Sequence, residues 1–169
     1  MENAKEHTPG RIHWVRRIIL LAVSGLLCGA LVALFAAREP TEPLTVENLH
    51  HARQRWDSAG IRNYRLTTQV GSQTYAAEVR DGRVVDLRTA DGKLVTSHDI
   101  QSYSVDGWFD VLERDLELRD DPSSPLGAAA GNALLRVRYN QRYAYLERYV
   151  RSIPGGRSQV VQVESFEPL

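Results

Sequence analysis

The sequence predicts an α+β fold in which helices pack on one face of an antiparallel sheet, behind an N-terminal transmembrane helix. Two segments have apolar residues at helical spacing, and each is followed by segments in which apolar and polar residues alternate. Turns of only a few residues, several of them Asp-Gly or Gly-Gly, join the alternating segments, and such turns allow only antiparallel pairing. The expected order is therefore helix, β-meander, helix, β-meander.

The transmembrane helix is predicted from the uncharged apolar run Ile18–Ala37. At about 1.5 Å per residue, this run covers the roughly 30 Å hydrocarbon core of a bilayer. Arg11, Arg16 and Arg17 precede it, which places the N-terminus in the cytoplasm and the rest of the chain on the other side. The predicted organisation is a cytoplasmic tail over 1–17, a single span over 18–37, a linker over 38–43 and an extracytoplasmic domain over 44–169.

Two other readings of the same run are weaker. A cleaved signal peptide needs small residues at positions −3 and −1, but cleavage after Ala37 or Ala36 puts Phe35 or Leu34 at −3. A lipoprotein would use Cys28, whose preceding residue, Leu27, is not the small residue expected there. The run is therefore interpreted as an uncleaved anchor.

One face of the predicted span carries small residues at every fourth position. Such a stripe lets two membrane helices approach closely, so a homodimer through this face is possible, although small residues are also common in membrane helices in general. The stripe consists of Gly25, Gly29, Ala33 and Ala37.

The first helix of the domain is expected between Thr45, as N-cap, and Gly60, as the residue that ends it. Strands follow around Tyr64–Val70, Tyr75–Val79 and Val85–Thr89, and a short further strand is expected at 94–95. The second helix is predicted from Val105 to Leu118 with Ser104 as N-cap. A loop over 119–131 precedes three strands, around Leu135–Tyr139, Tyr143–Val150 and Val161–Phe166.

Several motifs resemble one bacterial family, known as domain of unknown function 6174, over residues 50–169. They are Trp56, Asn63–Leu66, Val79–Val85, Ser104–Asp110, Val137–Asn140, Ala144–Leu146 and Ser165–Leu169. The resemblance implies an envelope protein held by a lipid or a membrane helix, with no activity to carry over. Asn140, Ala144 and Leu146 stand where the family has Asp, Gly and Pro, which puts in doubt any role of those family residues here.

No catalytic, cofactor or metal motif is visible, so no enzyme activity and no cofactor are expected. The formal net charge is zero, which argues against nucleic acid as a partner. His50 and His51 are neighbours on a helix, where their side chains diverge by about 100°. The alternative is an enzyme with a site assembled from scattered residues, for example His98, Asp99 and Asp106 near the start of the second helix.

The candidate binding face is a set of tyrosines interleaved with arginines near the C-terminus. Tyr143, Tyr145 and Tyr149 share one face of the predicted strand, with Arg148 between them, and such residues are enriched at protein interfaces. Tyrosine is also an ordinary strand residue, so a structural role is the competing interpretation. The expected function is binding of an envelope protein or cell-wall component at the bacterial inner membrane, or else a structural role in a membrane complex.

Overall fold

The computed structural model describes residues 41–96, 99–128, 133–156 and 158–169. The chain divides into residues 1–40, which lie outside this description, and one compact unit, Thr41–Leu169, which contains the described hydrophobic core. The predicted span 18–37 and its small-residue stripe therefore lie outside the described residues. Within the described part, no helix combines the length and apolar character needed to cross a bilayer.

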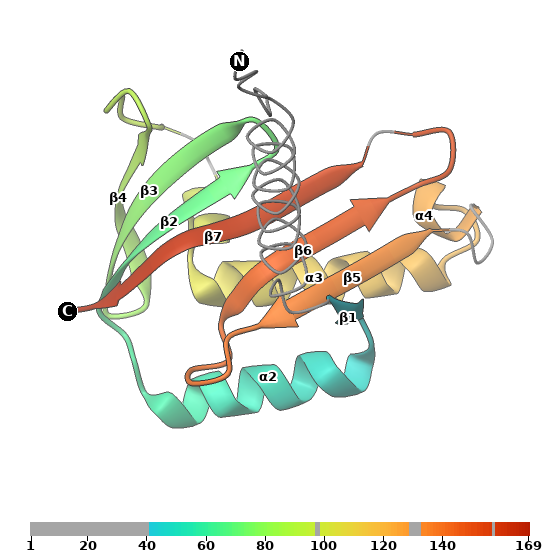
Figure 1. The fold of residues 1–169 in the computed structure, drawn as a ribbon, viewed down its shortest axis with the longest axis horizontal. Coiled ribbons are helices and arrows are strands. Elements are labelled where there is room, and N and C mark those ends of the chain that lie inside the picture. Colours follow the sequence, from blue (N-terminus) through green and yellow to red (C-terminus); the bar gives the residue numbers. More distant parts are fainter. Residues whose placement is uncertain (1–40, 97–98, 129–132, 157) are drawn as a thin grey trace, which may run out of the picture. The chain divides into compact units, whose positions relative to one another are not determined.

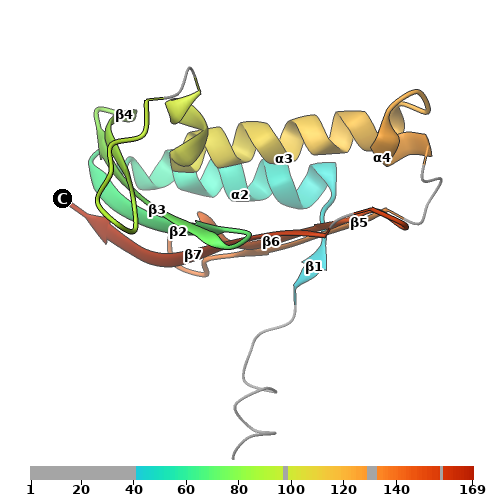
Figure 2. The ribbon, with the colours of Figure 1, turned by 90° about the horizontal axis from the view of Figure 1, so that it is seen from above.

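The compact unit is a seven-stranded antiparallel sheet with its helices on one face, as the sequence predicts (Figures 1 and 2). The strand order is β1-β5-β6-β7-β2-β3-β4. The two meanders lie side by side because β7, the last strand of the second, pairs with β2, the first strand of the first. The strands are β1 (Glu42–Pro43), β2 (Tyr64–Val70), β3 (Gln73–Arg80), β4 (Arg83–Thr89), β5 (Leu134–Tyr139), β6 (Leu146–Ser152) and β7 (Gln159–Pro168).

The first helix, α2 (Val46–Ala59), begins and ends where the sequence predicts. The Thr45 side chain accepts a hydrogen bond from the Asn48 backbone N–H, and the Asn48 side chain accepts one from the Thr45 N–H. This reciprocal capping box satisfies two N–H groups at the helix end. Gly60, at φ +64°, ends the helix in the left-handed conformation that glycine adopts without strain.

The second long helix, α3 (Val105–Asp120), starts at the predicted N-cap Ser104, whose Oγ accepts from the Gly107 N–H at 2.9 Å. A second acceptor comes from the sheet, since the Tyr64 hydroxyl accepts from the Val105 N–H at 2.9 Å. The start of α3 is thus joined to β2 by a hydrogen bond inside the core.

Two short helices flank α3 and were not predicted. The 3₁₀ turn η1 (Ile100–Tyr103) precedes it, and α4 (Pro125–Ala128) lies within the segment predicted to be a loop. Both are a single turn long, which is too short for a periodic pattern to show in the sequence. The strand predicted at 94–95 is reduced to one isolated bridge, between Leu94 and Arg88.

Two strand predictions are wrong at their boundaries. Glu42 and Pro43, assigned to the linker, form β1 at the sheet edge, a position that tolerates proline because one side of the strand needs no N–H donor. The strand predicted from Tyr143 starts only at Leu146, because residues 140–145 form a turn. In that turn Ala144 has φ +61°, a left-handed conformation that glycine adopts more readily than alanine.

Candidate functional site

The three tyrosines of the predicted binding face do not share a surface. Tyr149 is 2% exposed and points toward α3, where its hydroxyl donates to Asp115 Oδ2 at 2.5 Å. Burial and the neighbouring Asp115 raise the pKa of Tyr149. The prediction is therefore wrong for Tyr149, whose side of the sheet is set by a register shift between Arg138 and Tyr139 in the pairing of β5 with β6.

Tyr143 and Tyr145 lie in the turn before β6 and are half-buried. Both pack on Phe166, with ring centroids 5.9 and 4.5 Å apart, and Arg142 lies over the Tyr143 ring. The turn itself is held by Asn140, whose side-chain oxygen accepts from the backbone N–H groups of Arg142 and Tyr143. These two tyrosines extend the core at one end of the sheet and leave only part of their surface for a partner.

The residues of the scattered-site alternative do not come together where they are described. Asp99 lines a pocket of about 230 Å³ with Gln101 and Arg114, whereas Asp106 lines a different one of about 190 Å³ with Trp56 and Arg62. His98 lies outside the described residues. Among the described residues, no three His, Cys, Asp or Glu side chains gather so that they could hold a metal ion.

Asp106 instead anchors the two helices to each other. The Trp56 Nε1–H of α2 donates to Asp106 Oδ1 at 3.0 Å, and the Trp56 ring packs edge-on against Tyr64 and Phe166. Burial raises the pKa of Asp106, and the nearby Asp57 carboxylate acts in the same direction. Trp56, Tyr64 and Asp106 therefore make framework contacts around the start of α3.

This raised pKa predicts a specific pH dependence of stability. Above its ordinary value of 3.8, the folded state retains the Asp106 proton more readily than the unfolded state, so stability falls as pH rises through the folded pKa. Asp106→Asn keeps an acceptor for Trp56 and does not titrate. Its free energy of unfolding relative to wild type should therefore rise with pH above 3.8 and level off once the folded pKa is passed. Urea unfolding of residues 41–169 across this range measures it, and a relative stability that fell with pH would contradict the burial of this carboxylate.

A groove of about 300 Å³ lies between α2 and α3, and apolar residues of both helices contribute to its lining. Val46, Leu49 and Leu116 supply its apolar surface, and the Val46 side chain is 67% exposed at the first turn of α2. Three carboxylates line it from α3, on a single stripe of that helix: Glu113, Glu117 and Asp120.

The charge of this groove is predominantly negative. Among its lining residues only Arg53 is permanently cationic, and its guanidinium is held by Asp110 at 2.7 Å and by Glu113 at 3.1 Å. His50 is the remaining polar lining residue. The groove thus offers an apolar strip bordered by carboxylates, a combination that fits an aliphatic side chain ending in a cation.

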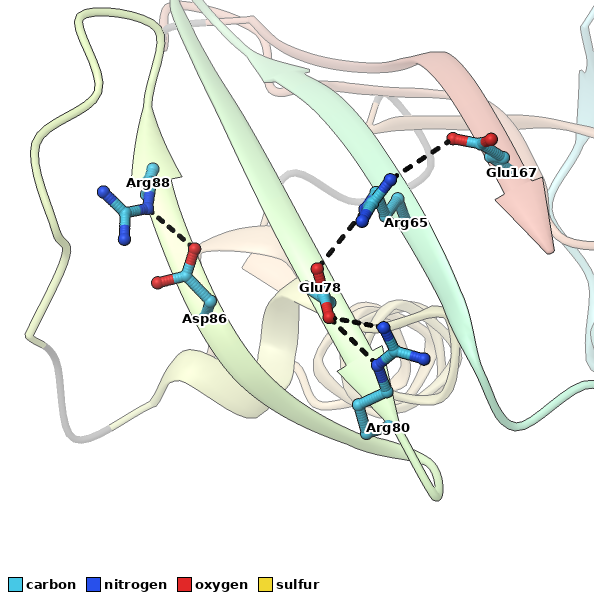
Figure 3. A network of polar contacts seen from close by, with 6 residues as sticks. All are labelled: Arg65, Glu78, Arg80, Asp86, Arg88 and Glu167. Atoms are coloured by element: carbon cyan, nitrogen blue, oxygen red, sulfur yellow. Dashed lines mark hydrogen bonds and ion pairs between the residues drawn. The ribbon is translucent and has the colours of Figure 1, made fainter. Parts of the chain in front are cut away.

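The face of the sheet opposite the helices is covered by no element that the structure describes (Figure 2). Over β2, β3, β4 and β7 this face carries an alternating network of ion pairs, shown in Figure 3. Arg65 links Glu78 and Glu167, Arg80 binds Glu78 at 2.8 Å, and Arg88 binds Asp86 at 2.7 Å. Three arginines and three carboxylates therefore neutralise one another on this half of the face.

Arg148, the fourth residue of the predicted binding face, lies on this open face and not beside the tyrosines. It is opposite Arg138 on β5 and Gln162 on β7, and it donates to the Gln162 side chain at 2.9 Å. Cross-strand partners lie on the same face of a sheet, so Arg138, Arg148 and Gln162 form one row. The structure thus separates Arg148 from Tyr149, which are adjacent in the sequence.

The groove and the open face were both missed by sequence reasoning, although signals for each are present. Glu113, Glu117 and Asp120 recur at helical spacing, and Arg136 and Arg138 alternate on one strand. The sequence does not show which helices and strands are neighbours in the fold, so neither signal could be assigned to a surface. Comparison with family models, curated proteins and solved structures finds no match for this chain.

Proposed function

We propose that this chain is a non-enzymatic binding protein of the bacterial cell envelope, anchored in the inner membrane by Ile18–Ala37 with its N-terminus in the cytoplasm. The domain binds a basic, amphipathic segment of another envelope protein in the groove between α2 and α3. The resemblance to domain of unknown function 6174 belongs to the same proposal. The observation that carries it is the groove, in which the exposed Val46 side chain lies beside an excess of carboxylates.

Charge complementarity determines the kind of partner. Glu117 and Asp120 are exposed at the groove, and no salt bridge to Glu117 is present within the described residues. A Lys or Arg side chain can lay its aliphatic part on the exposed Val46 and place its cation at Glu117. An acidic or uncharged partner would gain nothing from these carboxylates.

A non-enzymatic role is supported by what the polar residues of the motifs do. Trp56, Tyr64 and Asp106 are each engaged in a contact that joins a helix to another helix or to the sheet. A catalytic group has to present a polar atom to a substrate, whereas these atoms are satisfied inside the framework.

Photo-crosslinking in cells tests the groove directly. A photoreactive amino acid at Val46 of the full-length chain should capture a defined envelope protein, and the captured peptide should contain Lys or Arg among apolar residues. Glu117→Arg should reduce the yield of this crosslink at least about ten-fold, because the new arginine would repel the Lys or Arg of the partner that Glu117 attracts. Glu164→Arg makes the same charge change on an exposed position of β7 and should leave the crosslink unchanged.

Two results would refute the groove as the binding site. One is a captured peptide that is acidic or neutral, and the other is equal loss of the crosslink in the Glu117 and Glu164 variants. A crosslink obtained from Val85, which is exposed on β4, in place of Val46 would move the binding surface to the sheet.

A further inference from the structure

The half of the open sheet face formed by β5 and β6 is basic, in contrast to the neutralised half in Figure 3. This face carries Arg136 and Arg138 on β5 and Arg148 on β6. Side chains alternate along a strand, and the neighbouring Val137 and Tyr149 are buried toward the helices. Within β5 and β6, Glu147 is the only acidic residue. This half of the face therefore carries an excess of positive charge.

Two of these three arginines have neutral hydrogen-bond partners among the described residues. Arg138 binds Glu147 at 3.0 Å, and both side chains are partly exposed. Arg148 donates to the neutral Gln162, and Arg136 donates to the hydroxyl and carbonyl oxygens of Thr41. Two guanidinium groups are thus hydrogen-bonded to neutral oxygens, a state in which they can still bind a phosphate.

The position of Thr41 relates this basic half to the membrane. Thr41 is the first described residue, it is bound by Arg136, and β1 projects from the sheet on the side away from the helices (Figure 2). Residues 38–40 separate it from Ala37, so four peptide steps of at most about 3.6 Å keep Thr41 within about 14 Å of the end of the apolar run. If that run spans the membrane, the basic half lies close to the lipid headgroups.

We propose that the Arg136–Arg138–Arg148 face docks on the surface of the membrane by binding the phosphates of anionic phospholipids. This inference rests on the proposed membrane anchor. Tethering gives the face a high local concentration of headgroups, so a few arginines suffice where a free domain would bind weakly. Docking would hold the sheet toward the bilayer and leave the helix layer, with its groove, available to a partner.

The test uses the full-length chain in lipid nanodiscs, with Cys28→Ser and a fluorescent label on a new cysteine at Val150, which lies on the open face. Lipids with brominated chains quench a probe that lies at the membrane. Quenching should be strong when phosphatidylglycerol is mixed into phosphatidylcholine, weak in phosphatidylcholine alone, and lost at about 1 M salt, where the screening length is about 3 Å. A label at Ser58, exposed on α2, should not be quenched.

The matched variants separate local docking from general charge. Arg138→Gln with Arg148→Gln should lower the ratio of docked to undocked protein about 25-fold, about five-fold for each arginine. Arg65→Gln with Arg88→Gln removes the same charge from the neutralised half. It should change the ratio of docked to undocked protein less than two-fold, because salt screens charges that lie farther from the headgroups.

Three outcomes would overturn docking: equal quenching in both lipid mixtures, equal loss in both double variants, or quenching from Ser58 in place of Val150. If the arginine variants unfold, the comparison of the Val150 and Ser58 labels in the wild-type background still decides. If the chain fails to enter nanodiscs, that result refutes the membrane anchor, which is a different outcome from failure of docking. In that case co-sedimentation with phosphatidylglycerol vesicles tests the face alone.

Discussion

Gly107→Ala should destabilise the domain by about 3 kcal/mol or more, although it adds only one methyl group. A Cβ at this position would lie 2.1 Å from the Gln101 carbonyl oxygen and 2.5 Å from the Ser102 Cα. Both atoms belong to the backbone of η1, which packs against the first turn of α3, so no side-chain rotation relieves the contact. Either η1 leaves α3 or the helix start shifts away from Tyr64.

The expected sign is the reverse of what helix propensity predicts. In an open helix, replacing glycine by alanine stabilises by about 1 kcal/mol. Gly71→Ala is the matched control, because φ is +60° there and no atom lies within 4 Å of the added Cβ. It should cost only the strain of a left-handed alanine, about 1–2 kcal/mol. Urea unfolding of residues 41–169 measures both, and a stabilising Gly107→Ala would contradict the contact between η1 and α3.

Asp115→Ala should lower the free energy of unfolding by about 3 kcal/mol, measured by urea unfolding of residues 41–169. The Asp115 side chain is 4% exposed and accepts from Arg151 at 3.0 Å and from Tyr149 at 2.5 Å. Removing one partner of a buried ion pair typically costs about 3–5 kcal/mol, since the other charge stays behind. The lower end applies because the Arg151 side chain keeps 33% of its surface exposed and can be partly solvated.

Two variants check that the cost comes from the buried pair. Asp110→Ala removes a carboxylate of the same helix whose side chain is 65% exposed, and exposed pairs such as Asp110 with Arg53 contribute at most about 1 kcal/mol. Asp115→Asn keeps an acceptor for Tyr149 and should recover part of the loss. Equal costs for Asp115→Ala and Asp110→Ala would mean that the site under α3 is hydrated.

The buried Asp115 also shows why the tyrosine hypothesis was wrong for Tyr149. Tyrosines and arginines that alternate on a strand have the same pattern whether they face solvent or a helix that carries a buried acid. Asp115 lies 34 positions before Tyr149 in the sequence, and no local pattern links the two. The hydrogen bond between Tyr149 and Asp115 depends on how α3 packs on the sheet. Because it buries Tyr149, the groove replaces the tyrosines as the candidate binding surface.

Sequence patterns alone predict the α+β class, both long helices with their caps, and most strands. These features depend on residues that are neighbours in the chain: periodic apolar residues, the Thr45 and Ser104 caps, and short turns such as Asp81-Gly82. The sequence also predicts the membrane run Ile18–Ala37, which stays a prediction.

Which surfaces are open, and what charge they carry, depends on how the helices and strands pack in three dimensions. A register shift between Arg138 and Tyr139 determines which side chains of β6 face the helices, and a shift of one residue exchanges the two faces of a strand. The groove exists because α2 and α3, separated by three strands in the sequence, lie against each other. Surfaces made by distant segments depend on how those segments pack, and that information is absent from any local pattern.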